Sequence, residues 1–251
     1  MAKDWMTFYY AEPQPERFVE EVRKLAALGV LATPERAFPA IVFLGAVIAQ
    51  NGHRVQSWFD ALLDLGAADL RALQDAAWLS RAPEAHAYLT AKGLTPTTGA
   101  QQAELLDMKV DPTVLDALWA RYFATGDLRA VRKVVSALDH MTDFGAAKAY
   151  SSTAKTDADK ARATRDAIFQ AASWSLESLM REHAPLEDFC ADLVRSGEMT
   201  PNERCALAII LAKLEPAVWR VQIDPRSGTA SITWSDTKPS TPHEKPWWKL
   251  W

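Results

Sequence analysis

The 251-residue sequence is poor in cysteine, glycine and histidine. Its two cysteines, Cys190 and Cys205, cannot build a disulfide framework. Ten glycines leave little material for a loop that cradles phosphate groups, and neither G-x-x-x-x-G-K-[ST] nor G-x-G-x-x-G occurs. The G-x-S-x-G turn that presents a nucleophilic serine is missing as well. These absences argue against the common nucleotide-binding and serine hydrolase folds.

The chain also lacks an excess of positive charge and a long apolar run. Lysine and arginine total 28 against 32 aspartates and glutamates, so we expect no nucleic-acid partner. The longest apolar run, residues 37–49, is too short to cross a bilayer and predicts a buried helix. Residues 1–16 bring acidic residues and prolines before the apolar segment of a secretory signal could develop, which predicts a cytoplasmic protein.

Prolines mark the predicted starts of helices. A proline suits the first helical position because its missing N–H would have no partner there. Thr200-Pro201-Asn202-Glu203 predicts a capping box, in which Thr200 and Glu203 satisfy each other's backbone N–H groups. Asp111 and Thr33 are predicted N-caps of the same kind. Six prolines stand just before apolar-periodic stretches: Pro15, Pro34, Pro83, Pro112, Pro185 and Pro201.

Apolar residues recur at steps of three and four along most of the chain, as in the stretch 128–141. This period predicts roughly ten helices. Residues 219–234 differ, because apolar and polar residues alternate on both sides of a Pro/Gly turn, which predicts a β-hairpin that packs its tryptophan face on the helices. The predicted fold is all-α, a helical bundle or a short α-solenoid of antiparallel helix hairpins, with a small C-terminal β-hairpin.

Composition predicts an all-helical domain over 1–216, the hairpin over 217–235, and a polar, tryptophan-ended tail over 236–251. Two stretches could separate subdomains within the helical part. Residues 93–103 are rich in threonine, glycine and glutamine, and residues 150–165 are rich in small polar and charged residues. The second stretch is either a loop or the exposed start of a long helix.

Two local resemblances accompany this pattern. The stretch Leu118–Leu138 has an aromatic-rich first helix, a Gly-Asp turn and a second helix that ends in Ala-Leu. It resembles a tetratricopeptide-type helix pair, which implies a helix hairpin of about 25 residues, although no second copy follows at a 34-residue offset. The segments 8–18 and 38–44 are similar to uncharacterised bacterial proteins of unknown function, which implies a bacterial source and no particular activity.

A metal site has one candidate constellation. None of the five histidines pairs with another at i, i+4, and neither H-E-x-x-H nor C-x-x-C occurs. Asp139 and Asp143 are four residues apart and could share a helix face with His140 between them, a set that could hold a divalent ion. The alternative is an ordinary helix end, with His140 near the negative end of the helix dipole. We therefore assign no metal, cofactor or catalytic residue from the sequence.

Cys190 is the other candidate for chemistry, with His183 as its base. A thiol needs a neighbouring base to become a nucleophile, and His183 lies seven residues away. Pro185 should start a new helix between the two residues and so separate them. Both Cys190 and Cys205 sit in apolar surroundings in the sequence, which favours buried structural cysteines.

Tryptophan is abundant, with ten residues. Four of them lie in helical stretches beside alanine or leucine and are predicted to fill the core: Trp58, Trp78, Trp119 and Trp174. The tail carries three more, namely Trp247, Trp248 and Trp251. They could dock onto the chain's own helical groove, insert into a partner's pocket or touch a membrane interface.

Basic residues gather around the Gly126 turn and in the following segment. They are Arg121, Arg129, Arg132, Lys133, Lys148, Lys155, Lys160, Arg162 and Arg165. Such a cluster could form a groove for nucleic acid or an acidic peptide. Because Asp127, Asp157, Asp159 and Asp166 are interleaved with it, a solvated helix face is the favoured interpretation.

Helix hairpins build extended binding surfaces, and recognisable catalytic motifs are missing. The first functional hypothesis is therefore a non-catalytic protein-interaction or scaffold module, with a groove between helix pairs that takes a protein or peptide partner. The second is an enzyme with a metal or acid/base site in the helical core, where Asp139, His140 and Asp143 would be tested. The third is a bacterial immunity factor or secretion chaperone. Neither the partner nor the oligomeric state follows from the sequence.

Overall fold

The structure is a computed structural model that describes residues 4–95, 104–150, 156–224 and 230–235. Its contacts divide the chain into two compact units, Met1–Val134 and Val135–Trp251. The boundary falls inside one helix, α8 (Leu128–Ser136), and at neither of the stretches that the sequence offered as a subdivision. The domain limits drawn from composition remain a prediction.

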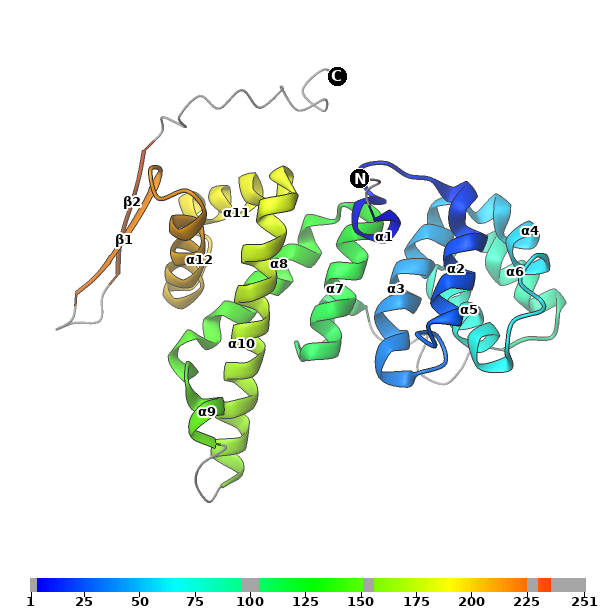
Figure 1. The fold of residues 1–251 in the computed structure, drawn as a ribbon, viewed down its shortest axis with the longest axis horizontal. Coiled ribbons are helices and arrows are strands. Elements are labelled where there is room, and N and C mark those ends of the chain that lie inside the picture. The colour runs from blue at the N-terminus through cyan, green and yellow to red at the C-terminus, as the bar shows by residue number, and fades with distance from the viewer. Residues whose placement is uncertain (1–3, 96–103, 151–155, 225–229, 236–251) are drawn as a thin grey trace. The chain divides into compact units, whose positions relative to one another are not determined.

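The N-terminal unit is helical throughout its described part (Figure 1). Its elements, with 3₁₀ helices marked η, are α1 (Trp5–Phe8), η1 (Pro15–Arg17), α2 (Phe18–Ala27), α3 (Pro34–Gln50), η2 (Gly52–Arg54), α4 (Val55–Asp60), α5 (Ala67–Leu79), α6 (Pro83–Ala91), η3 (Leu105–Asp107) and α7 (Pro112–Thr125). The first residues of α8 complete the unit.

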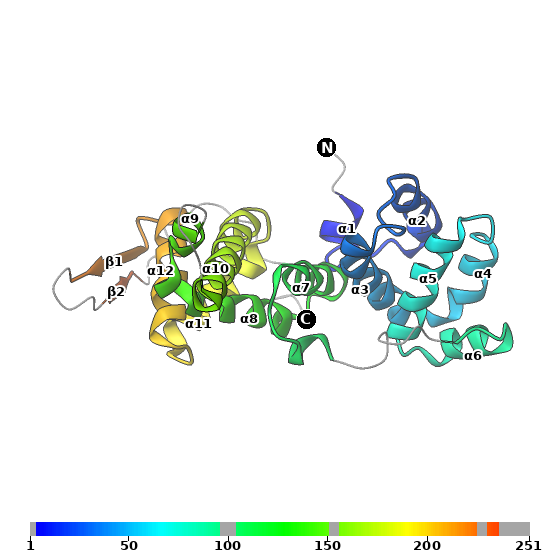
Figure 2. The ribbon, with the colours of Figure 1, turned by 90° about the horizontal axis from the view of Figure 1, so that it is seen from below.

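Helix α3 is the centre of this unit, because it packs against both α5 and α7 (Figure 2). Its side chains Phe43 and Leu44 are fully buried. Gly45 allows α5 to come close, since a Cβ atom there would lie 2.8 Å from the carbonyl oxygen of Ala76. Replacing Gly45 would therefore force α3 and α5 apart.

The C-terminal unit is built around one long helix, α10 (Asp157–Glu182). Three neighbours pack on it, namely α9 (Ala146–Tyr150), α11 (Ala184–Ser196) and α12 (Pro201–Leu214), together with η4 (Ala137–Asp143). Strands β1 (Trp219–Ile223) and β2 (Ala230–Trp234) pair antiparallel, and β1 packs on α12 (Figure 2). The predicted all-α fold with a C-terminal β-hairpin is confirmed.

The hairpin presents one tryptophan to the helices. Trp219 pairs with Trp234 in the register, and their ring centroids lie 5.8 Å apart. Trp219 is buried, and the Arg195 guanidinium of α11 lies over its ring at 5.2 Å. Trp234 keeps about a third of its surface exposed, so the tryptophan face of the hairpin is only half covered.

The predicted helix starts are largely confirmed. Helices α3, α6, α7 and α12 each begin at a proline, and Pro185 is the second residue of α11. Thr200 and Glu203 form the capping box, and the Asp111 carboxylate accepts from the backbone N–H of Val114. Thr33 is the exception. Its hydroxyl donates to the Gly29 carbonyl at 2.7 Å, so it closes the turn before α3 and does not cap the helix.

Trp174 is not in the core. Trp58 and Trp119 are buried as expected, but 74% of Trp174 is exposed. The buried side of α10 follows Ile168, Ala172 and Leu176, at four-residue steps. A residue two positions from that stripe is turned by about 200° around the helix axis, so Trp174 faces away from the core.

Candidate binding pocket

The N-terminal unit contains a pocket of about 750 Å³ next to α3. Its walls come from α3, the end of α5, η3, the end of α7 and the start of α8. One wall is apolar and follows α3 at three- and four-residue steps: Phe38, Ile41, Val42, Ala46 and Ala49. Pockets of this size accommodate small molecules or a few side chains of a peptide.

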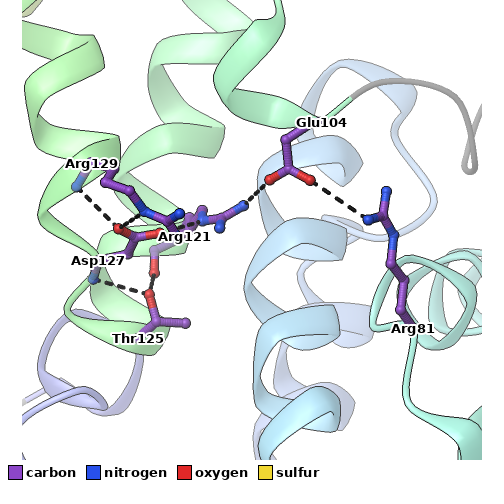
Figure 3. A network of polar contacts seen from close by, with 6 residues as sticks. All are labelled: Arg81, Glu104, Arg121, Thr125, Asp127 and Arg129. Atoms are coloured by element: carbon purple, nitrogen blue, oxygen red, sulfur yellow. Dashed lines mark hydrogen bonds and ion pairs between the residues drawn. The ribbon is translucent and has the colours of Figure 1, made fainter.

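The polar wall of the pocket is a network of charged side chains (Figure 3). Arg121 joins two carboxylates, because its Nε donates to Asp127 at 3.0 Å and its Nη1 donates to Glu104 at 2.7 Å. Arg129 binds Asp127 through Nε at 2.9 Å and Nη2 at 2.8 Å. Arg81 faces Glu104 from the other side, with 3.8 Å between Nη1 and Oε2.

Local sequence explains how Asp127 reaches this position. Helix α7 ends at Thr125 and is capped by Gly126, whose φ of 70° is left-handed and whose N–H donates to the Tyr122 carbonyl. Asp127 follows at once and caps α8, since its carboxylate accepts from the backbone N–H of Arg129 at 3.0 Å. The Gly-Asp turn expected from the sequence is therefore present, and it fixes the carboxylate that holds Arg121 and Arg129.

Two of the three arginines in the network are more exposed to solvent than its two carboxylates, whereas Arg121 is largely covered. The side chains of Arg129 and Arg81 are 72% and 66% exposed, whereas those of Asp127 and Glu104 are 13% and 39% exposed. The hydrogen bonds from Arg129 and Arg121 hold the pKa of the Asp127 carboxyl at about 2, so it stays ionised at neutral pH. A ligand that approaches this wall meets guanidinium groups first.

Arg81 occupies an unusual backbone position. Its φ is 56°, and it is the only non-glycine residue of the described ranges with a positive φ. The left-handed region costs such a residue roughly 1–2 kcal/mol. Arg81 follows the last turn of α5, where Ser80 bonds the Ala77 carbonyl and the Ala82 N–H. This bend brings the Arg81 side chain to the rim of the pocket.

The predicted metal candidates have other partners. Asp139 accepts from the Thr200 hydroxyl at 2.6 Å, and Asp143 accepts from Arg162 and Arg165 at 3.1 and 2.6 Å. These carboxylates lie in η4, a 3₁₀ helix, in which residues four apart are about 120° apart around the axis. The sequence interpretation assumed an α-helical face. Among the described residues, no group of three or more histidine, cysteine, aspartate or glutamate side chains could hold a metal ion.

Cys190 is fully buried in α11. Burial, with a smaller contribution from the Glu187 charge, raises the pKa of its thiol, and burial also raises the pKa of Cys205. This environment opposes the thiolate that a nucleophile requires. His183 is the N-cap residue of the same helix and is also buried.

The basic cluster is distributed over both units. Arg121 and Arg129 belong to the pocket, whereas Arg162 and Arg165 bind Asp143. Asp166 is not on a solvated face, because it is fully buried and accepts from the Ala147 backbone N–H at 2.9 Å. Lys155 and the tail tryptophans Trp247, Trp248 and Trp251 lie outside the described residues.

Sequence analysis missed two members of the network. Arg81 and Glu104 are 23 positions apart, and each sits outside the periodic helical stretches. Only the fold brings Glu104 into contact with Arg121, pairs Arg81 with Glu104 and places both beside α3. The sequence marks Arg121, Arg129 and Asp127 as charges near a turn, through the Gly-Asp pair that follows an aromatic-rich helix.

Comparison of the chain with known protein families, with curated proteins and with solved structures finds no match in any of the three. Within the described ranges, none of the helices combines the length and the apolar character that a membrane span requires.

Proposed function

We propose that this protein is a non-catalytic interaction module and that the pocket beside α3 takes a segment of a protein partner. The observation that carries the proposal is a cavity of about 750 Å³ whose lining combines an apolar stripe of α3 with a network of charged side chains. Such a cavity suits an amphipathic occupant, with apolar side chains on one side and polar groups on the other.

The groups on the polar wall support binding more than catalysis. The carboxylates of Asp127 and Glu104 are engaged by arginines, and the Thr125 hydroxyl donates to the Arg121 carbonyl at 2.6 Å. The Ser80 hydroxyl likewise donates to Ala77. Covalent catalysis needs a nucleophile next to a general base, and Ser80, Glu104, Thr125 and Asp127 do not form such a pair.

The α7–α8 helix pair contributes to the proposed binding site. Its Gly-Asp turn forms one edge of the pocket, so the stretch that resembles a tetratricopeptide helix pair would serve here as a binding edge. A bacterial cytoplasmic protein with a scaffold, immunity or secretion-chaperone role would be compatible with such a site.

The test places a photoreactive side chain in the pocket. Benzoylphenylalanine at Ala49, an exposed residue of the apolar wall, should form an adduct with one partner segment in lysate of the source cells. The matched control carries the same group at Ala68, an exposed position of α5 outside the pocket. Equal adducts at both positions, or none at Ala49, would show that the pocket is not the binding site.

A further inference from the structure

A short segment of the chain already lies against the pocket and shows which chemistry it accepts. Glu104 precedes η3, and its carboxylate takes a 2.7 Å hydrogen bond from Arg121. Leu105 is 93% covered, and Leu105 and Met108 line the same cavity. The segment Glu104–Met108 thus combines an acidic group on the arginines with two large apolar side chains.

This segment leaves part of the polar wall unused. Arg81 forms its ion pair with Glu104 at 3.8 Å, which is too long for a hydrogen bond. Among the described residues, no hydrogen bond to its five N–H donors is found, although its side chain is largely exposed. Arg129 is also exposed, while the carboxylate that it binds is covered. A second carboxylate could therefore bind at Arg81 while Glu104 keeps its hydrogen bond from Arg121.

The apolar wall is open in the same region. Ala49 is exposed, and Ile41 and Ala46 are only partly covered, whereas their α3 neighbours Phe43, Leu44, Val47 and Ile48 are fully buried. Large apolar side chains of a ligand that cover these residues would remove apolar surface from water, which favours binding. Asp75 and Glu104 also line the pocket, so the preference for an acidic occupant rests on the greater exposure of the Arg81 and Arg129 guanidinium groups, which a basic occupant would meet.

On the basis of the proposed function, we infer that the partner segment is an acidic and apolar peptide. It places one or two large aliphatic or aromatic side chains on Ile41, Ala46 and Ala49. An aspartate or glutamate next to them in the sequence binds the Arg81 guanidinium, with Arg129 nearby. The order of groups repeats that of Glu104 and Leu105.

The experiment is the selection of a random dodecapeptide library on the immobilised full-length protein. The Ala49→Trp variant carries a large side chain on the apolar wall and blocks it, so peptides that still bind this variant bind elsewhere and are discarded. Ala68→Trp, with the same side chain outside the pocket, is the matched control. Peptides that bind the wild type and Ala68→Trp but not Ala49→Trp should carry aspartate or glutamate beside large apolar residues. Circular dichroism of both variants checks that they fold.

The outcomes separate this inference from the proposed function. Pocket-dependent peptides that lack acidic residues, or that are basic, would overturn the inference and leave the proposed function in place. A selection without any pocket-dependent peptide would overturn both. Binding of decanoate under those conditions would then assign the pocket to a small apolar acid.

A second measurement tests Arg81 directly. Arg81→Asn removes the guanidinium, and asparagine tolerates the left-handed backbone that position 81 requires. It should weaken the best acidic peptide about tenfold, as expected for loss of a hydrogen bond to a charged group. It should not change the binding of the same peptide with its acid replaced by the amide. Arg71→Asn, at an exposed arginine of α5 outside the pocket, is the control. Equal weakening of both peptides would contradict the role of Arg81.

Discussion

The hydroxyl of Thr200 donates to the Asp139 carboxylate at 2.6 Å and thereby ties the start of α12 to η4, 61 positions earlier in the chain. The same hydroxyl accepts from the backbone N–H of Glu203 at 3.2 Å. One side chain therefore caps a helix and joins two elements of the C-terminal unit. Asp139 has a structural role in this arrangement.

Removal of the Thr200 hydroxyl tests this role. Thr200→Ala should lower the free energy of unfolding by about 1–2 kcal/mol, because both the cap and the bond to Asp139 are lost. Thr200→Ser, which keeps the hydroxyl, should recover most of that loss. Urea denaturation of the two variants, of Asp139→Ala and of the double variant Thr200→Ala/Asp139→Ala checks the prediction. Additive effects of Thr200→Ala and Asp139→Ala in the double variant would show that the two residues are not coupled.

The pair of arginines on Asp143 gives a second prediction. The hydrogen bond from Arg165, together with that from Arg162, lowers the pKa of the Asp143 carboxyl. Asp143→Asn should cost less than about 1 kcal/mol, since both arginines are substantially exposed. Elemental analysis should give the same metal content for the wild type, Asp143→Asn and His140→Ala. A stoichiometric metal that is lost in both variants would restore the metal-site hypothesis.

The acid dependence of stability should report on Asp127. Its folded pKa of about 2 lies below the ordinary aspartate value, so the ionised form is favoured in the folded state. The stabilisation is complete above about pH 5 and is lost as the pH falls through 3.8 toward 2. Asp127→Asn keeps the side-chain oxygen that caps α8 but removes this contribution.

Thermal unfolding at a series of pH values measures the effect. The curve for Asp127→Asn should lie below the wild type at pH 7 and approach it near pH 2. Glu16→Gln, at an exposed residue, is the control for the loss of one surface carboxylate. A curve for Asp127→Asn that runs parallel to the wild type would contradict the prediction.

The two cysteines should be unreactive in the folded protein. Cys190 is fully buried, Cys205 is nearly so, and burial raises the pKa of both thiols. Reaction with a disulfide reagent such as Ellman's should be at least about a hundredfold slower than in guanidinium chloride, since it must await opening of the structure. Ala68→Cys supplies an exposed thiol as a positive control. Rapid labelling of Cys190 in folded protein would reopen the nucleophile hypothesis.

Sequence reasoning succeeded where the information is local. The capping box of Thr200 and Glu203, the Asp111 cap and the Gly126-Asp127 turn each depend on residues within three or four positions of one another. The period of apolar residues likewise reports the burial of one side of a helix. These features determine most of the all-α fold.

It failed where the answer depends on tertiary context. The stretch around Asp139 was read with an α-helical period, but it forms a 3₁₀ helix packed against α12. Trp174 was assigned to the core because of its type, although its position on α10 turns it to solvent. The contact between Arg81 and Glu104 joins two irregular segments, and no periodic signal marks either one.

Under the proposed role of Arg81, its left-handed backbone sets folding stability against ligand binding. Glycine there would relieve the strain and should raise the melting temperature, because it adopts a φ of 56° without penalty. The same change would take away the guanidinium that the proposed ligand needs. An arginine at position 81 would therefore lower the melting temperature somewhat and provide the guanidinium that binds the proposed ligand. Mutagenesis that selects for stability alone would replace the arginine and lose this binding.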